Sequence, residues 1–320
     1  MTQTTISNTK KIKAMQKVTK VFLLLAGSAL LVSGTFSSCK KSSNNNNNNL
    51  PPIGGYNTSN DVAAANLMAH WTFDNTNNEA ISSTAPKTVQ GASFVTGVKG
   101  QALSLNKGYL AFPPTITNLN TVMASFTVSA WIKVKNNGST VSTVFALTNE
   151  PGVQSDWNNG PIEMYVETAT SRPDTIDLHT AFASLEGVDW QHGDNINDYD
   201  PGDTAFKFVI ALPTDWIHYV ATYDASTSRI KIYANGNLVS NTNFELRKDA
   251  SGNLIGNLNY PTPTQVLIGS FANLAVGYTG ITTQSWQGLF TGSIDELRVY
   301  NKALAASDIS ALYQLEKAGR

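Results

Sequence analysis

Apolar and polar residues alternate with a period of two along several short stretches of the chain. The clearest stretch is 125–134, where every second residue from Phe126 to Val134 is apolar, and residues 67–74 alternate in the same way. This period is that of a half-buried β-strand, because successive side chains of a strand point to opposite faces. The same reasoning predicts further strands near residues 142–148, 161–167, 205–211, 215–223, 264–270 and 286–300.

Turn residues separate these stretches. Asn235-Gly236 lies between residues 230–233 and 238–240, and both residues tolerate a positive φ, so a tight hairpin is expected there. Residues 106–108 (Asn-Lys-Gly) predict a second hairpin turn. Many short strands with such punctuation favour an all-β fold, a two-sheet antiparallel β-sandwich of the jelly-roll type.

One helix is expected, at the C-terminal end. Ser307 can cap it, Asp308 suits its first turn, and Ile309, Leu312 and Tyr313 form an apolar stripe. We expect this short helix to pack on an edge of the sandwich.

The N-terminal region predicts a lipoprotein signal peptide over residues 1–38. Five lysines between Lys10 and Lys20 precede an apolar segment, and small residues then lead to Cys39. The apolar segment is shorter than the ~20 residues of a spanning helix, although a signal anchor with an incidental cysteine is the alternative. Cys39 would be acylated and become the first mature residue; Met15 would begin an equally good signal.

The mature chain divides into a tether and one domain. Residues 39–60 include six consecutive asparagines and cannot bury enough apolar surface to fold, whereas residues 61–320 suit one large β-domain. The whole chain has 22 basic and 23 acidic residues, but seven lysines and no acid lie in residues 1–41, so the remainder is 15 against 23, or −8. This charge argues against nucleic acid as a partner. Cys39 is the one cysteine, so the fold has neither disulfides nor thiol chemistry.

Four stretches, residues 70–74, 125–134, 216–236 and 292–304, resemble in this order the LamG-like domains of the concanavalin A-like lectin/glucanase superfamily. The resemblance implies a jelly-roll domain, mostly non-catalytic, that binds glycans or proteins and often a calcium ion. It makes Asp74 and Asp295, from the first and last of these stretches, candidate ligands of a structural calcium. The signal and the tether resemble lipoproteins of the Bacteroidetes, which places the protein in the outer membrane. Lys40 and Lys41 replace the acidic residues usual after the cysteine of surface-exposed members, so surface and periplasmic display both stay open.

Residues 150–203 carry twelve acidic residues and a single base, Arg172, which predicts a long acidic insertion in loops between the middle strands. Its aromatic side chains could stack on the C–H faces of a sugar, while carboxylates and amides bind the hydroxyls. The alternative is that the tryptophans only pack the insertion onto the sandwich. The predicted carbohydrate-binding residues are Trp157, Trp190, Tyr199, Asp156, Asn158, Asp189 and Asp194. Residues 194–203 are also rich in oxygen ligands, but their spacing matches no calcium loop.

Catalysis is not expected. Asp295 and Glu296 are adjacent and would point to opposite faces of a strand, and Glu163 and Glu167 would lie ~13 Å apart, too far for a glycosidase. The four histidines show no metal-ligand spacing. The sequence therefore predicts a membrane-anchored, non-catalytic carbohydrate-binding lipoprotein, with a protein-binding adhesion module as the alternative and a divergent glycoside hydrolase as the third.

Overall fold

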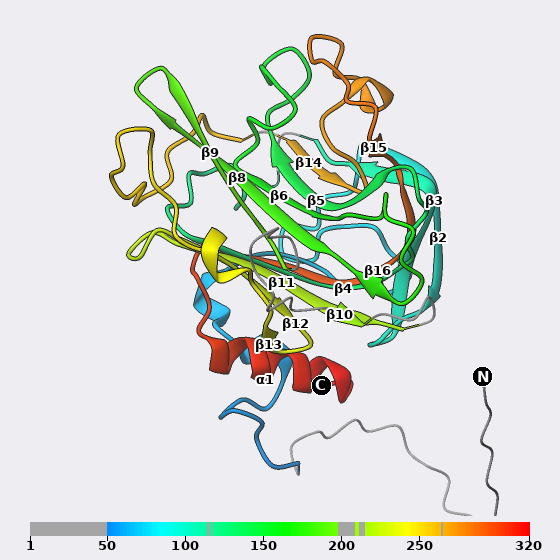
Figure 1. Cartoon of the computed structure of the whole chain (residues 1–320). Coiled ribbons are helices and arrows are strands. Elements are labelled where there is room, and N and C mark those ends of the chain that lie inside the picture. Colours follow the sequence, from blue (N-terminus) through cyan, green and yellow to red (C-terminus); the bar gives the residue numbers. More distant parts are fainter. Residues whose placement is uncertain (1–49, 114–115, 117, 198–208, 211–214, 264) are drawn as a thin grey trace, which may run out of the picture. The chain divides into compact units, whose positions relative to one another are not determined.

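A computed structural model describes residues 50–113, 116, 118–197, 209–210, 215–263 and 265–320 (Figure 1). Within these ranges no helix is long and apolar enough to cross a membrane. The strands are β1 (Leu67–Trp71), β2 (Thr88–Thr96), β3 (Gln101–Ala111), β4 (Phe126–Val134), β5 (Val141–Thr148), β6 (Ile162–Val166), β7 (Thr175–Ile176), β8 (Leu178–Glu186), β9 (Asp189–Ile196), β10 (Val209–Ile210), β11 (Ile217–Asp224), β12 (Arg229–Ala234), β13 (Asn237–Leu238), β14 (Gln265–Ile268), β15 (Gln287–Gly288) and β16 (Phe290–Tyr300). The helices are the 3-10 turns η2 (Ser59–Asp61), η3 (Ala64–Asn66), η4 (Thr242–Phe244) and η5 (Leu274–Val276), and α1 (Ala306–Lys317).

The strands form two stacked layers (Figure 1). One layer runs β13-β12-β11-β4-β16, with β1 beside β16, and the other runs β14-β5-β6-β8-β9. The expected all-β antiparallel sandwich is confirmed, and so are the expected strands near 67–74, 125–134, 142–148, 161–167, 215–223, 264–270 and 286–300. The strand expected near 205–211 lies outside the described residues except for residues 209–210, which form β10. The two layers are not separate sheets, however, because strand β3 pairs with both β16 and β14. The two layers therefore belong to one continuous sheet that curls over on itself.

Strand β3 changes layers at residues 106–108, where the sequence predicted a hairpin turn. That prediction is wrong: β3 continues through these residues, and the hairpin between β2 and β3 turns at residues 97–100 instead. Lys107 has φ +44°, and the pairing of β2 with β3 shifts register opposite it. The Asn-Lys-Gly segment therefore forms a β-bulge, which bends a strand without reversing it.

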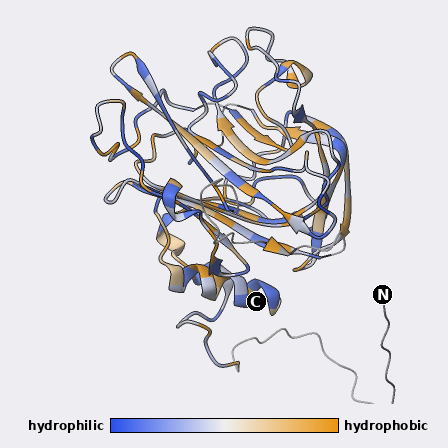
Figure 2. Ribbon diagram, in the orientation of Figure 1, coloured by the Kyte–Doolittle hydropathy of each residue, from blue (hydrophilic) through white to orange (hydrophobic). Residues whose placement is uncertain are grey.

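The core lies between the two layers, and it is large enough to hold the fold without disulfides. Alternate residues of β4, β11 and β16 bury their side chains there, as Phe126, Tyr219 and Leu297 show. Trp71 from β1 contacts Phe112 edge to face, with ring centroids 5.4 Å apart. Figure 2 shows the hydrophobic segments that run along the strands of both layers.

The predicted loop insertion at residues 150–203 is in large part sheet, which corrects the interpretation of this segment. Strands β8 and β9 form a long hairpin that pairs in register from His179↔Ile196 to Glu186↔Asp189. Gly187, with φ +64°, supplies the left-handed residue that this two-residue turn needs. The many polar residues had masked the strand pattern, because one face of the hairpin is exposed.

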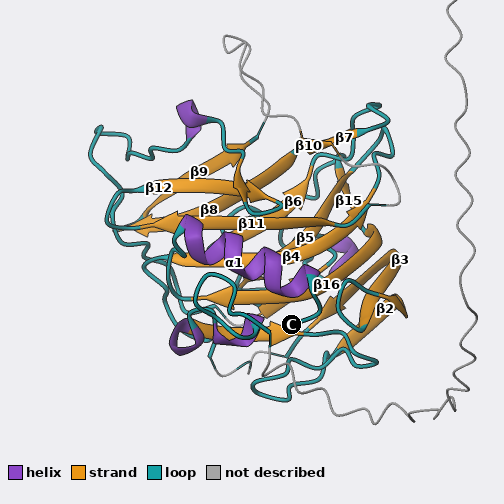
Figure 3. Cartoon of the chain, turned by 90° about the horizontal axis from the view of Figure 1, so that it is seen from below, coloured by secondary structure: helices purple, strands orange, loops and turns teal. Residues whose placement is uncertain are grey.

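Helix α1 lies across strands β11, β4 and β16 on the outside of their layer (Figure 3). Ala305 rather than the expected Ser307 is its N-cap, and Asp308 lies in the first turn, as predicted. Its Glu316 is fully buried and accepts hydrogen bonds from Trp131 Nε1 (2.8 Å) and Arg298 Nε (2.8 Å). Arg298 Nη2 in turn lies 2.6 Å from Glu296 Oε2, so a buried ion network fixes the helix to the sheet.

A second bulge corrects the expectation that Asp295 and Glu296 point to opposite faces. Glu296 has φ +45°, and the pairing of β16 with β4 gains one residue between Asp295 and Arg298. Ile294 and Leu297 both enter the core, so the two carboxylates between them lie together on the outer side. Both are fully buried in the part of the chain that the structure describes.

Candidate functional site

The outer face of β6, β8 and β9 carries the candidate site. In β6 the apolar residues Ile162, Met164 and Val166 enter the core, so Glu163 and Tyr165 point to the opposite face. The register places Glu163 beside Ala181 of β8 and Ala181 beside Asp194 of β9. The small side chain of Ala181 therefore leaves a depression between two carboxyl groups.

This depression, which we call the first hollow, has a volume of about 260 Å³. Trp157 reaches it from the loop between β5 and β6, where its half-buried ring packs against Phe271 and Trp286 with centroids 5.7 and 4.9 Å away. That loop and the loop after β14 stand next to each other in Figure 1, and Tyr278 links them by donating a 2.7 Å hydrogen bond to the carbonyl of Asn149. The residues that line the first hollow are Trp157, Asn158, Glu163, Tyr165, Ala181, Phe182, His192, Gly193 and Asp194.

Glu163 is the most unusual of these side chains. It is 2% exposed, and its Oε2 atom has no hydrogen-bond partner among the described residues. Burial, and after it the charge of Asp156, raises the pKa of Glu163 well above its ordinary value. The first hollow is therefore lined by a buried carboxyl group whose charged form is disfavoured and whose Oε2 atom has no hydrogen-bond partner among the described residues.

A second hollow of about 550 Å³ adjoins the first at Asp194, which lines both. Here His179 bridges two carboxylates, with Nδ1 2.7 Å from Glu167 Oε1 and Nε2 3.1 Å from Asp194 Oδ2. These bonds outweigh burial and raise the pKa of His179, and the bond to His179 lowers that of Asp194. Arg247 also binds Asp194, at 2.9 Å. The two hollows thus form one groove, with the unpartnered carboxyl group of Glu163 in one part and the paired carboxylate of Asp194 at the junction.

The structure brings together only part of the predicted carbohydrate-binding set. Trp157, Asn158 and Asp194 line the first hollow, and Asp156 is exposed beside it. Asp189 lies at the exposed tip of the β8–β9 hairpin, opposite Glu186. Half-buried Trp190 packs on the core and stacks 6.4 Å from His192, but it lines neither hollow; Tyr199 and Cys39 lie outside the described residues.

Sequence reasoning missed the roles of Glu163, Tyr165, His179 and His192. The alternation in residues 162–167 does place Glu163, Tyr165 and Glu167 on one face, so this signal was present. Nothing local indicates that His179 and His192 join them, because that depends on the pairing of β6 with β8 and of β8 with β9.

The two predicted calcium ligands flank the turn between β2 and β3. Asp74 Oδ1 accepts a hydrogen bond from the amide of Gln101 (2.8 Å), and Asp295 Oδ2 accepts from those of Val98 (2.7 Å) and Lys99 (3.1 Å). Carboxylate oxygens that face N–H donors do not fit a cation site. Within the described ranges no group of three or more His, Cys, Asp or Glu side chains could hold a metal. Both carboxylates instead hold the turn, and calcium binding stays a prediction of the resemblance.

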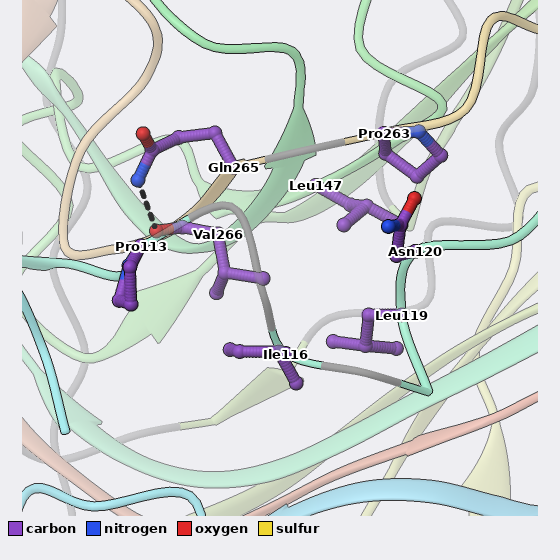
Figure 4. Close-up of a pocket in the computed structure, with 8 residues that line it drawn as sticks. All are labelled: Pro113, Ile116, Leu119, Asn120, Leu147, Pro263, Gln265 and Val266. Carbon is purple, nitrogen blue, oxygen red and sulfur yellow. Dashed lines mark hydrogen bonds between the residues drawn. The ribbon is translucent and has the colours of Figure 1, made fainter. Parts of the chain in front are cut away.

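A much smaller hollow lies beside β14 (Figure 4). Its volume of about 10 Å³ suits no more than one water molecule. The amide of Gln265 donates to the carbonyls of Phe112 and Val266 there. This hollow is a packing feature, and we do not consider it a ligand site.

Comparison with known proteins agrees with this architecture. The chain belongs to the concanavalin A-like lectin/glucanases superfamily, whose family model matches residues 105–310. No curated relative matches the sequence.

Solved structures of several binding domains are similar to the chain. Domain 4 of an extracellular arabinanase from Geobacillus stearothermophilus, solved with arabinotriose, is 21% identical, with a TM-score of 0.47 over 78% of this chain and 98% of that domain. The binding domain of botulinum neurotoxin serotype G is 12% identical, with a TM-score of 0.50 over 78% of this chain. The chain spans about half of that neurotoxin domain, 51% of its length.

Proposed function

We propose that this protein binds carbohydrate, without catalysis, in the groove on the outer face of β6, β8 and β9. The observation that carries the proposal is the first hollow, where Trp157 and Tyr165 lie beside a buried carboxyl group with an unpartnered oxygen. Aromatic rings stack on the C–H faces of sugars, and carboxyl and amide groups bond to sugar hydroxyls. Membership of a superfamily of lectins and glucanases supports the same function.

The size of the groove suits a short oligosaccharide. The hollows of about 260 and 550 Å³ meet at Asp194, and together they fall in the range of about 300–1,000 Å³ usual for ligand sites. The second hollow is lined by polar side chains that pair with one another, His179 with Glu167 and Arg172 with Asp177. A ligand could therefore extend from the aromatic hollow into a polar one.

A glycan array with the wild-type domain and the Trp157→Ala variant tests this function. We expect Trp157→Ala to weaken binding at least tenfold, about 1.4 kcal/mol, because the stacking surface is lost. Trp216→Ala is the control, since Trp216 is also half-buried but lies beside Lys133, outside both hollows. Binding that survives Trp157→Ala unchanged, in a variant with the wild-type circular dichroism spectrum, would contradict the site. A folded wild type that binds no glycan would contradict the function and favour the adhesion alternative.

A second candidate function, glycoside hydrolysis, rests on Glu163 and Asp194. They stand two strand spacings apart, about 10 Å between Cα atoms, and one is a raised-pKa acid while the other is ionised. Asp194 is nevertheless held by His179 and Arg247, which makes it a poor base. We expect no release of reducing ends from bound oligosaccharides. Release that Glu163→Gln abolishes would establish the enzyme.

We further propose that the domain is anchored to the outer membrane through a lipid on Cys39. The support is the basic, apolar and small-residue order of residues 1–39. Of the predicted tether at residues 39–60, the asparagine-rich part before residue 50 would link the lipid to the domain. Residues 50–60 instead belong to the domain, because Ile53 and Tyr56 pack against Leu312 and Leu315.

A further inference from the structure

Two of the residues that line the first hollow each carry a buried oxygen atom without a hydrogen-bond donor. Glu163 Oε2 and Asn158 Oδ1 are both enclosed, and neither has a hydrogen-bond partner in the described part of the chain. Leaving a buried polar atom unpaired is costly, so such atoms point to a missing partner. Two acceptors in one hollow call for a ligand group with several N–H or O–H donors.

The charges around this hollow favour a cation. Of the residues that line it, His192 alone can become positive, and burial lowers its pKa. Asp194 is already paired with His179 and Arg247 on its other side, whereas Glu163 has no cation beside it. Exposed Asp156 adds a further negative charge close enough to act on Glu163.

The aromatic residues that line the first hollow also favour a cation. Trp157 and Tyr165 line the same hollow as Glu163. The faces of tryptophan and tyrosine rings attract ammonium groups, most strongly where water is excluded. An ammonium group has three donors and no acceptor, and therefore matches two acceptor oxygens better than a hydroxyl, which has one donor.

We infer that the first hollow takes the amino group of an amino sugar, held by Glu163 and Asn158 against the ring of Trp157. This inference rests on the proposed function, since the remainder of the sugar would occupy the same groove. The ammonium donates to Glu163 Oε2 and Asn158 Oδ1, and its positive charge favours the ionised form of Glu163. The parent sugar, with a hydroxyl in place of the amine, gains neither the charge pair nor the second donor.

Matched monosaccharides test the inference. The probes are the methyl glycosides of glucosamine, galactosamine and mannosamine, each paired with its parent hexose and its N-acetyl derivative, and a trilysine peptide as an amine without a sugar. Affinities at pH 7 would be measured by ligand-observed NMR titration. We expect at least one amine to bind tenfold or more tightly than its parent hexose.

Substitutions test whether the preference for the amine over the parent hexose comes from the first hollow. Glu163→Gln keeps the shape but removes the charge, and we expect it to bring the ratio of affinities to within about twofold. Glu186→Gln, an exposed acid on the same hairpin strand β8, is the control and keeps the ratio, which excludes a general attraction to an acidic surface. Asn158→Ala removes the second acceptor in a loop and lowers the ratio even if Glu163→Gln does not fold.

The outcomes separate this inference from the proposed function. Equal affinity within all three amine and hexose pairs would overturn the amino-sugar assignment, while glycan binding on the array would still stand. Trilysine that binds as tightly as the amino sugars, with the same dependence on Glu163, would overturn it in favour of a protein ligand. A preference that Glu163→Gln and Asn158→Ala leave intact would place the amine elsewhere and would also overturn it.

Discussion

At the scale of single residues, position in the sheet decides what a buried ionisable group can do. Glu163 and His218 both lie on the outer face of a layer and both are buried. Glu163 lines a hollow that a ligand can enter, whereas His218 lies beneath helix α1 and contacts the rings of Trp131 and Tyr313. The first is a candidate binding group and the second is structural.

His218 should make the stability of the domain depend on pH. Burial, and then the charge of Arg298, lowers its pKa from 6.5 to about 3, although Ser129 lies 2.8 Å and Glu316 3.6 Å from Nε2. A depressed folded-state pKa favours the neutral ring, so its contribution is present above pH 6.5 and is lost as the pH falls toward 3. The loss is about 1.4 kcal/mol per pH unit.

Urea unfolding between pH 7 and 4.5 checks this. We expect His218→Gln, which cannot titrate, to lose less stability over this interval than the wild type. His192→Gln is the comparison: burial also lowers the pKa of His192, but this residue is exposed, so the variant should depart from the wild type less than His218→Gln does. If the free energy of unfolding falls by the same amount between pH 7 and 4.5 in the wild type and in His218→Gln, the prediction is contradicted.

A substitution at Asp295 distinguishes a structural role of its carboxyl group from a role in binding a metal ion. Its carboxyl group accepts hydrogen bonds from three backbone amides, those of Val98, Lys99 and Glu296. We expect Asp295→Ala to lower the free energy of unfolding by about 1–3 kcal/mol, because buried donors lose their partner. Thermal unfolding with calcium and with chelator measures this. An equal loss in both supports the structural role, and a calcium-dependent rise in melting temperature that the substitution abolishes would support the predicted ion.

At the scale of secondary-structure elements, two β-bulges give the strands a geometry that regular pairing would not allow. The bulge at residues 106–108 lets β3 leave β16 for β14, and the bulge at Glu296 places two neighbouring carboxylates on one face. Neither bulge changes the number of strands, so neither can be predicted by counting strand-like segments in the sequence. The bulge at residues 106–108 depends on close contact between the backbones of β2 and β3.

Gly108 should be intolerant of a side chain for this reason. A Cβ atom there would lie 2.3 Å from the carbonyl oxygen of Gln90 and 3.1 Å from atoms of Gly91. We expect Gly108→Ala to cost about 1–3 kcal/mol of unfolding free energy. Gly280→Ala is the matched control, since its Cβ would meet nothing within 4 Å, and it should cost less than about 0.5 kcal/mol. Equal unfolding midpoints for the two variants would show that the bulge can relax.

At the scale of the whole molecule, strands of one layer and loops from distant parts of the chain together form the groove. β6, β8 and β9 supply its floor, the loop after β5 supplies Trp157, and the segment around η4 supplies Phe244 and Arg247. Residues nearly ninety positions apart therefore line one continuous surface. On the opposite layer, the ion network of Arg298 and Glu316 is buried under α1.

The lipid anchor is the prediction that concerns the full chain. Expressed in a Gram-negative host, the wild type should sediment with membranes and incorporate labelled palmitate, because acylation of Cys39 would add membrane affinity. Cys39→Ser should release it to the soluble fraction, and Ser38→Ala, beside the cysteine, should not. Membrane association that survives Cys39→Ser would favour the alternative of a signal anchor.

The sequence by itself determined the fold class, most of the strands and the superfamily. This was possible because the period-two pattern of β4 and the Asn235-Gly236 turn are local properties, set by side-chain alternation and by backbone φ. It also indicated Trp157 and Asp194 as candidates, because both stand out in composition. It failed at residues 106–108 and 178–196, where a turn signal proved to be a bulge and a polar segment proved to be a hairpin.

Only the tertiary structure decided which of the candidate residues lie together. The pairing of β6, β8 and β9 brings Glu163 and Asp194 to either side of Ala181, and places Trp157 near Glu163 but Asp189 at a hairpin tip. The physical reason is that strand register and burial are collective properties of the packed sheet. A carboxyl group acquires a raised pKa and an unpartnered oxygen from its surroundings, and no local pattern of residues specifies those surroundings.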